Sequence, residues 1–288
     1  MHEAAGVPAE IERELAVDFE LVGASSDADG VIVTPAVEVD AAYLDAAGPQ
    51  LRIVANYAVG IDNVDLDAAR ERGIVVSNTP GVLTNATAEH AMALTLALLR
   101  RIGEGDRALR RSDHWEWGPD FMVGESLEGK ELLVVGPGRI GRRVAELALA
   151  HGARPTFAGR DDDLLDLLPT ADVVTLHCPL TPETRHLVDD AALAAMKTTA
   201  VLVNTARGLV VDEAALVSAL EAGSIAGAAL DVFEHEPAVS EELLAMENVV
   251  LTPHIASATR ETRHAMGMLV VSALRAVLLE GRTPPNAV

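Results

Sequence analysis

The chain has 288 residues, which suits one large or two medium domains, and a formal net charge of −22, which opposes binding to nucleic-acid phosphates. Hydrophobic residues make up 49% and aromatic residues only 3%, a composition that favours helix-covered parallel sheets over an aromatic-rich β-sandwich. The single cysteine, Cys178, excludes an internal disulfide. With no recognisable signal peptide or membrane span, these features predict a cytoplasmic protein without nucleic-acid or membrane partners.

In the first part of the chain, strand and helix patterns alternate. Short β-branched apolar segments predict strands at 29–35, 51–58 and 73–78, and helical patterns lie between them at 41–48 and 65–73. A long helix is expected from Ala86 to Arg111, with Thr84 and Asn85 as N-cap residues. Residues 1–16 contain no apolar segment that predicts a strand.

After Lys130 the alternation restarts. Strands are expected at 131–136, 154–159, 171–178, 200–206, 225–230 and 248–254, and a final helix from about Thr259 to Glu280. This order predicts an α/β fold with parallel sheets and right-handed crossovers. We expect a doubly wound Rossmann domain for dinucleotide binding over 86–256, and a smaller flavodoxin-like α/β domain made from both chain ends, 1–85 and 257–288.

The first strand of the second part leads into the sequence GPGRIG, which fits a dinucleotide-binding fingerprint. Gly136 permits the tight turn, Gly138 leaves room for a pyrophosphate, and Gly141 lets the following helix pack closely. The backbone N–H groups of Arg139 and Ile140 then lie at a helix N-terminus, where anions are favoured. The pattern predicts that a dinucleotide binds here.

The fingerprint also predicts an acidic residue about 20 positions later, which would bind the adenosine ribose 2′-hydroxyl. Gly159 stands at that position and Arg160 follows it. A missing carboxylate and an added guanidinium favour a 2′-phosphate, so we expect NADP(H) in preference to NAD(H). The carboxylates of residues 161–163 could neutralise Arg160, but we expect them to cap the next helix and point away.

Three further side chains follow predicted strands, at the edge where α/β sheets bind their ligands: Arg207, Glu236 and His254. An arginine, a carboxylate and a histidine beside a nicotinamide suit reversible hydride transfer to a 2-keto acid. Glu234 competes with Glu236 for the role of partner to His254. The other histidines, His90 and His186 among them, are expected on the surface or in packing, and no spacing suggests a metal site.

Seven ordered motifs resemble those of the D-isomer-specific 2-hydroxyacid dehydrogenase family, and most closely its glyoxylate/hydroxypyruvate reductases. They are VGIDNVD, TPGVLTNATAEHAMAL, GPGRIG, HCPLTPETRHL, NTARG, ALDVFEHEP and TPHIASAT. The resemblance extends from about residue 30 to the C-terminus. It implies an enzyme that reduces a small 2-keto acid to the D-2-hydroxy acid with NAD(P)H and that forms a homodimer.

The resemblance also implies a role for each site residue. Arg207 would bind the substrate carboxylate and polarise the keto oxygen, His254 would donate a proton, and Glu236 would orient His254 and favour its charged form. Backbone N–H groups of Val59 and Gly60 would also hold the carboxylate, and Asp231 would bind the nicotinamide amide. Together with the fingerprint, the residues expected at the cofactor are Gly136, Gly138, Arg139, Ile140, Gly141, Gly159, Arg160, His177, Pro179, Thr184, Thr205, Ala206, Asp231, His254 and Ala256.

Some features depart from the family pattern or leave alternatives open. The family's first apolar strand is missing from residues 1–16, so we expect either that the true start lies upstream or that the substrate domain lacks this strand. Asn56 and Tyr57 stand where phosphoglycerate dehydrogenases usually place a basic residue, which favours an unphosphorylated substrate. A phosphoglycerate-type or other D-2-hydroxyacid dehydrogenase using NAD is the alternative. A nucleotide-sensing, corepressor-like binding protein is an alternative of another class, against which the set of Arg207, Glu236 and His254 argues.

Overall fold

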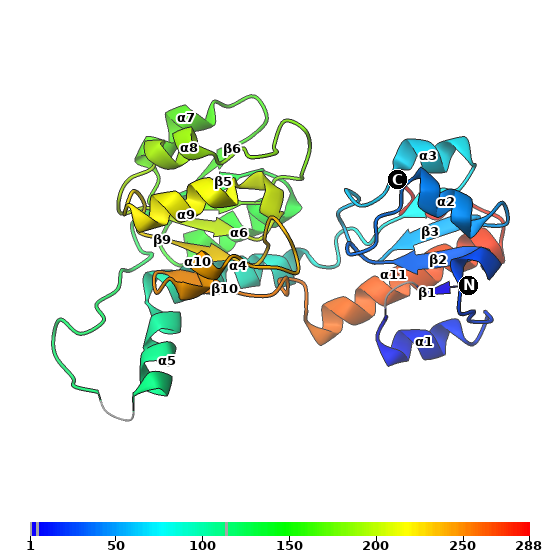
Figure 1. The fold of residues 1–288 in the computed structure, drawn as a ribbon, viewed down its shortest axis with the longest axis horizontal. Coiled ribbons are helices and arrows are strands. Elements are labelled where there is room, and N and C mark those ends of the chain that lie inside the picture. Colours follow the sequence, from blue (N-terminus) through cyan, green and yellow to red (C-terminus); the bar gives the residue numbers. More distant parts are fainter. Residues whose placement is uncertain (1, 4–5, 113–114) are drawn as a thin grey trace. The chain divides into compact units, whose positions relative to one another are not determined.

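The computed structural model describes residues 2–3, 6–112 and 115–288 of the chain. Contacts within the chain divide it into two compact units, which are coloured along the sequence in Figure 1. The terminal unit comprises Met1–Leu83 and Ser257–Val288, and the central unit comprises Thr84–Ala256. Each unit is an α/β structure built on a parallel sheet, which confirms the expected fold class.

The terminal unit is built on a parallel sheet with the strand order β1-β2-β3-β4 in its described residues. Helices α2 and α3 lie along one face of this sheet, and α1 and α11 lie along the other (Figure 1). Its elements are β1 (His2–Glu3), α1 (Ala9–Leu15), β2 (Gly30–Val33), α2 (Ala41–Ala47), β3 (Ile53–Asn56), α3 (Leu66–Glu71), β4 (Val75–Ser77) and α11 (Arg260–Leu278).

The first strand corrects an expectation from the sequence. Residues His2 and Glu3 pair in parallel with Val31 and Ile32 of β2, so the prediction that residues 1–16 contain no strand is wrong. The segment lacks the apolar alternation by which strands are recognised, because β1 is only two residues long. Its place in the sheet is given by its pairing with β2 through the backbone, which does not require apolar side chains.

The central unit contains a parallel sheet with the order β10-β9-β8-β7-β5-β6 in the part of the chain that is described. Strand order reverses between β5 and β7, the position where doubly wound sheets bind ligands. Its elements are α4 (Thr84–Leu99), α5 (Ile102–Arg111), β5 (Glu131–Val135), α6 (Arg139–Ala150), β6 (Arg154–Ala158), α7 (Leu164–Leu167), β7 (Val173–Leu176), α8 (Asp190–Ala195), β8 (Val201–Asn204), α9 (Glu213–Glu221), β9 (Gly227–Leu230), α10 (Glu241–Ala245) and β10 (Val249–Leu251).

Both faces of this sheet are buried at the inner strands β5, β7, β8 and β9, which explains why these strands are largely apolar rather than alternating, whereas the edge strand β6 is mostly exposed. Leu133, Val174 and Leu202 face the side of α8 and α9. Their neighbours Leu132 and Val173 face the opposite side, where α4 and α6 pack. The sheet is therefore rigidly held, and the loops after its strands project from a fixed frame.

The long helix predicted over 86–111 is two helices, α4 and α5, separated at Arg101. Arg101 has a φ of 54°, in the left-handed region, and Thr84 and Asn85 lie in the first turn of α4 rather than before it. The break has a tertiary cause. The Leu99 carbonyl accepts from the Glu125 N–H at 2.8 Å, and Gly124 packs so closely that a Cβ there would lie 2.4 Å from that oxygen.

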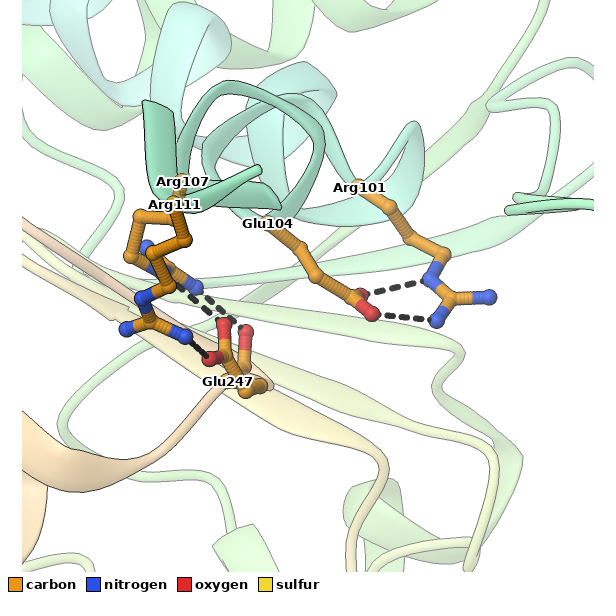
Figure 2. Close-up of polar contacts among 5 residues, drawn as sticks. All are labelled: Arg101, Glu104, Arg107, Arg111 and Glu247. Atoms are coloured by element: carbon orange, nitrogen blue, oxygen red, sulfur yellow. Dashed lines mark hydrogen bonds and ion pairs between the residues drawn. The ribbon is translucent and has the colours of Figure 1, made fainter. Parts of the chain in front are cut away.

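Helix α5 is joined to the body of the central unit by ion pairs rather than by apolar packing (Figure 2). Arg107 Nε lies 2.9 Å from Glu247 Oε2, and Arg111 pairs with the same carboxylate. Arg101 and Glu104 pair with each other at the start of the helix. In the residues that the structure covers, no helix is both long and apolar enough to cross a membrane.

Candidate active site

The fingerprint loop lies at the reversal point of the central sheet, between β5 and α6. Gly136 has a φ of 96°, and a Cβ there would lie 2.6 Å from the backbone nitrogen of Cys178, so only glycine fits. At Gly141 a Cβ would lie 2.3 Å from the Gly136 carbonyl oxygen. Both glycines are therefore required by close backbone contacts.

The same loop has the room and the donors for a pyrophosphate. A Cβ at Gly138 would meet no atom within 4 Å, so the space in front of the loop is open. Gly138 is the N-cap of α6 and makes no side-chain cap, so the N–H groups that follow, at Arg139 and Ile140, remain available to an anion. These features fit a dinucleotide.

The end of β6 departs from expectation in one respect. Asp163 caps α7 by accepting from the Leu165 N–H at 3.0 Å, as predicted. Asp162, however, turns back, and its Oδ2 accepts from the Gly159 N–H at 2.7 Å. The prediction that all three aspartates point away from the ribose position is therefore wrong for Asp162, because an unpaired backbone N–H attracts a carboxylate three residues away.

Two side chains of the expected catalytic set form a hydrogen-bonded pair. His254 Nδ1 lies 2.8 Å from Glu236 Oε2, and the other oxygen of Glu236 accepts from the Phe233 N–H at 3.1 Å. Both side chains are more than one-third exposed, so a substrate can reach them. His254 has a φ of 53°, a conformation that is strained for a residue other than glycine.

Arg207 follows β8, and its segment lies directly against that of Glu236. A Cβ at Gly208 would lie 1.9 Å from the Phe233 carbonyl oxygen, so the two loops are in backbone contact. The Asn204 side chain donates to the Arg207 carbonyl oxygen at 2.8 Å and fixes the start of this loop. The structure thus brings the loops of all three residues together at the carboxyl ends of β8, β9 and β10.

Glu234, the competing partner, faces elsewhere. Its Oε1 lies 2.9 Å from His186 Nε2, and its Oε2 accepts from the Glu213 N–H at 3.2 Å. Glu213 returns the contact by accepting from the Glu234 N–H at 3.0 Å. Glu236 is therefore the partner of His254. Glu234 is the partner of His186, a contact that the sequence did not predict.

The Asp231 carboxylate holds the segment that carries His254. Its Oδ1 accepts from the Ile255 N–H and its Oδ2 from the Ala256 N–H, both at 2.8 Å, while its carbonyl oxygen accepts from the His254 N–H at 2.8 Å. Asp231 has no exposed surface in this structure. Its contacts support the left-handed backbone of His254, and its expected role toward the nicotinamide amide stays a prediction.

Two residues behind Asp231 were missed at the sequence level, His90 and Thr252. The Thr252 hydroxyl donates to Asp231 Oδ1 at 2.6 Å, so its oxygen is left to accept from His90 Nε2 at 3.0 Å. Burial opposes ionisation of Asp231, but hydrogen bonds from His90, from Thr252 and from two backbone N–H groups hold its pKa below the usual value. The carboxylate is therefore ionised where it binds the His254 segment.

The remaining expected cofactor residues lie at the carboxyl ends of β7 and β8 and beyond. His177 is half-buried, its enclosed Nδ1 has no partner among the described residues, and desolvation of the ring lowers its pKa to about 4. Thr205 Oγ1 is likewise buried without a partner, beside Ala206. Thr184 donates to the Pro179 carbonyl oxygen at 2.7 Å and closes the turn after β7.

Val59 and Gly60 belong to the terminal unit. Asn78 donates to the Val59 carbonyl oxygen at 2.8 Å, and Asn56 donates to the Gly60 carbonyl oxygen at 2.7 Å. The turn after β3 is therefore fixed within its own unit by two amide side chains.

A separate hollow of about 300 Å³ lies in the central unit, beneath α5. It is lined at the amino-terminal edge of the sheet, by Val201, Ala226 and Asn248 among others. Arg207, Glu236 and His254 follow the opposite ends of the same strands. The hollow is thus no part of the candidate active site.

Comparison with known proteins identifies the family. Residues 92–256 match the model described as "D-isomer specific 2-hydroxyacid dehydrogenase, NAD binding domain". The chain is 46% identical, over 286 residues, to a glyoxylate reductase of Aeropyrum pernix, covering 93% of this chain and 85% of that protein. The chain belongs to the D-isomer-specific 2-hydroxyacid dehydrogenase family.

Solved structures of this dehydrogenase family agree with the fold. The TT0316 protein of Thermus thermophilus is 43% identical, with a TM-score of 0.93, and the match covers 100% of this chain and 99% of that one. An NADPH-dependent glyoxylate/hydroxypyruvate reductase of Sinorhizobium meliloti, in complex with NADP and malonate, is 35% identical, with a TM-score of 0.88, over 100% and 95% of the two chains. The chain is thus an oxidoreductase of this family with an NAD-binding domain.

Proposed function

We propose that this dehydrogenase reduces a small unphosphorylated 2-keto acid, of the glyoxylate or hydroxypyruvate class, to the D-2-hydroxy acid. The observation that carries the proposal is the hydrogen-bonded pair of His254 and Glu236 beside the Arg207 loop, in the same unit as the phosphate cradle. Relatives named glyoxylate reductase, at 43–47% identity, support the substrate class.

The proposed chemistry divides between the cofactor and the side chains. A bound reduced nicotinamide supplies the hydride that the keto carbon receives. Arg207 binds the substrate carboxylate and stabilises negative charge on the keto oxygen. His254 donates a proton to that oxygen, and Glu236 keeps the imidazole oriented for the transfer. In the reverse direction, His254 accepts the proton from the hydroxyl group.

For the cofactor, we propose that NADP(H) is preferred to NAD(H). Gly159 removes the usual carboxylate from the end of β6, and Arg160 follows with a guanidinium that can pair with a 2′-phosphate. The NADPH-dependent relative of known structure supports this preference. The central unit, from Thr84 to Ala256, would be the dinucleotide-binding domain.

The terminal unit would be the substrate-binding domain, with Val59 and Gly60 as carboxylate ligands. Asn56 and Tyr57, at the position where a phosphorylated substrate would call for a basic residue, are both buried, and neither carries a cation. This supports a substrate without a phosphate group.

An assay with purified full-length chain tests the proposal. Oxidation of NADPH and of NADH is followed with glyoxylate, hydroxypyruvate, pyruvate and 3-phosphohydroxypyruvate. We expect turnover with the first two and little with the phosphorylated acid. Turnover only with 3-phosphohydroxypyruvate would favour a phosphoglycerate-type enzyme. Cofactor binding without any turnover would contradict the proposed reaction and favour a nucleotide-sensing protein.

We also propose that the chain forms a homodimer through α5 and the loop after it. Large apolar side chains gather there in contact with solvent: Ile102, Leu109, Trp115, Trp117, Phe121 and Val123. Such a concentration is typical of protein interfaces. Light scattering should give twice the chain mass, and Leu109→Glu should give a monomer, whereas a native monomer would contradict this assembly.

A further inference from the structure

The end of β6 contains a carboxylate in an unusual place. Asp162 Oδ2 accepts from the Gly159 N–H at 2.7 Å. A side chain at position 159 would begin 3.5 Å from this same oxygen and 3.7 Å from Pro137 Cγ in the fingerprint loop. Asp162 thus brings a carboxylate, from three residues later in the chain, into the space where the fingerprint predicts an acidic side chain.

The turn after β6 carries both a positive charge, on Arg160, and negative charges, on the aspartates at 161–163. Arg160 is the cation that follows Gly159. It interacts electrostatically with the carboxylate of Glu183, in the loop after β7. A hydrogen bond from Thr181 and, to a smaller extent, the charge of Arg160 hold the pKa of the Glu183 carboxyl below its usual value. Asp163 is occupied as the cap of α7, and Asp161 is exposed. Of the three aspartates, Asp162 is the one turned toward Gly159.

We propose that Asp162 determines cofactor specificity. Its carboxylate accepts a hydrogen bond from the ribose 2′-hydroxyl of NAD(H) and repels the 2′-phosphate of NADP(H), in opposition to Arg160. The chain therefore retains use of NAD(H) despite Gly159. This inference rests on the proposed function in one respect, that the adenosine ribose binds at the end of β6.

The test compares two variants with the same change of charge. Asp162→Asn removes the charge and keeps an oxygen that can accept from the Gly159 N–H, so the turn is preserved. Asp161→Asn is the matched control, one residue away and without this contact. Dissociation constants for NADPH and NADH are measured by calorimetry on the full-length chain, and kcat/KM is measured with glyoxylate for both cofactors.

We expect Asp162→Asn to tighten NADPH binding about tenfold and to leave NADH binding unchanged or weaker. Asp161→Asn should alter either constant by less than about twofold, because solvent screens an exposed charge that lacks direct contact. An unchanged ratio of the two constants in Asp162→Asn, or an equal shift in Asp161→Asn, would overturn the proposal.

The calorimetry also separates this inference from the proposed reaction. Suppose that both cofactors bind and that Asp162→Asn changes the ratio of the NADPH and NADH dissociation constants, but that no 2-keto acid is turned over. The proposed reaction is then contradicted, and the role of Asp162 is supported. If turnover is normal and the ratio does not shift, the reaction stands and the role of Asp162 is wrong. Failure of both cofactors to bind the native chain would overturn both.

Discussion

Two regions of the central unit, the loops after β8–β10 and the turn after β6, are built in different ways. His254 is held by Glu236 and by the hydrogen bonds that Asp231 accepts from the backbone N–H groups of residues 254–256. At the ribose end, Asp162 is held by one hydrogen bond in an exposed turn. We therefore expect the reaction to depend on a rigid geometry that several hydrogen bonds hold at once. Cofactor preference should instead depend on a few exposed charges that single substitutions can alter.

The greatest loss is expected in the rigid region. His254→Gln removes the proposed proton donor and should lower kcat by about a thousandfold, because general acid catalysis contributes on this order. The variant should still bind the cofactor, as measured by calorimetry. His264→Gln is the matched control, since His264 also contacts a carboxylate, Glu10, but lies in the terminal unit. Normal turnover in His254→Gln would contradict the assignment of the acid.

Asp231→Asn tests whether the hydrogen bonds of Asp231 are needed to hold His254 in its strained conformation. An amide cannot accept from all the donors around Asp231, and the cost of about 1–3 kcal/mol should release His254 from its strained conformation. We expect kcat to fall by tens of fold, and to fall equally with the acetylpyridine analogue of the cofactor, which lacks the amide group. A smaller loss with the analogue would show instead that Asp231 acts on the nicotinamide amide.

His177, after β7, lies between the two regions and gives a pH-dependent effect. Burial lowers its pKa to about 4, so the unfolded chain binds more protons than the folded chain between about pH 6.5 and 4. The free energy of unfolding is therefore highest above pH 6.5, and it falls as the pH falls from about 6.5 to about 4. From pH 7 to 5, the free energy of unfolding should fall about 2 kcal/mol more in the native chain than in His177→Gln. Parallel losses in denaturant titrations would contradict the prediction.

A weaker effect is expected at the ribose end. Arg160→Ala should lower kcat/KM for NADPH about tenfold and leave NADH unaffected, since a charge-assisted hydrogen bond contributes about 1.5–3 kcal/mol when fully formed and less when exposed. Arg154→Ala is the control, because Arg154 is an exposed cation at the other end of β6, paired with Glu131. An equal fall in kcat/KM with both cofactors would show that Arg160 does not bind the 2′-phosphate.

The order of residues was enough to predict the alternating architecture, the phosphate cradle and the positions of Arg207, Glu236 and His254 after their strands. These depend on local patterns, namely apolar runs, glycine spacing and strand ends, which the chain displays directly. The start of the last helix near Thr259 was predicted in the same way, and the structure shows that Thr259 is its N-cap.

Contacts between residues far apart in the chain, or turned in an unexpected direction, required the folded molecule. The fold separated Glu236 from Glu234, a choice that the residues alone left open and only the family resemblance had made. It placed His90 behind Asp231 and turned Asp162 toward Gly159. It also divided the helix at Arg101 and paired His2 and Glu3 with β2. Most of these outcomes depend on groups from distant parts of the chain that meet only in the folded molecule. Asp162 contacts a residue only three positions away, but which of the three aspartates turns back depends on the geometry of the turn.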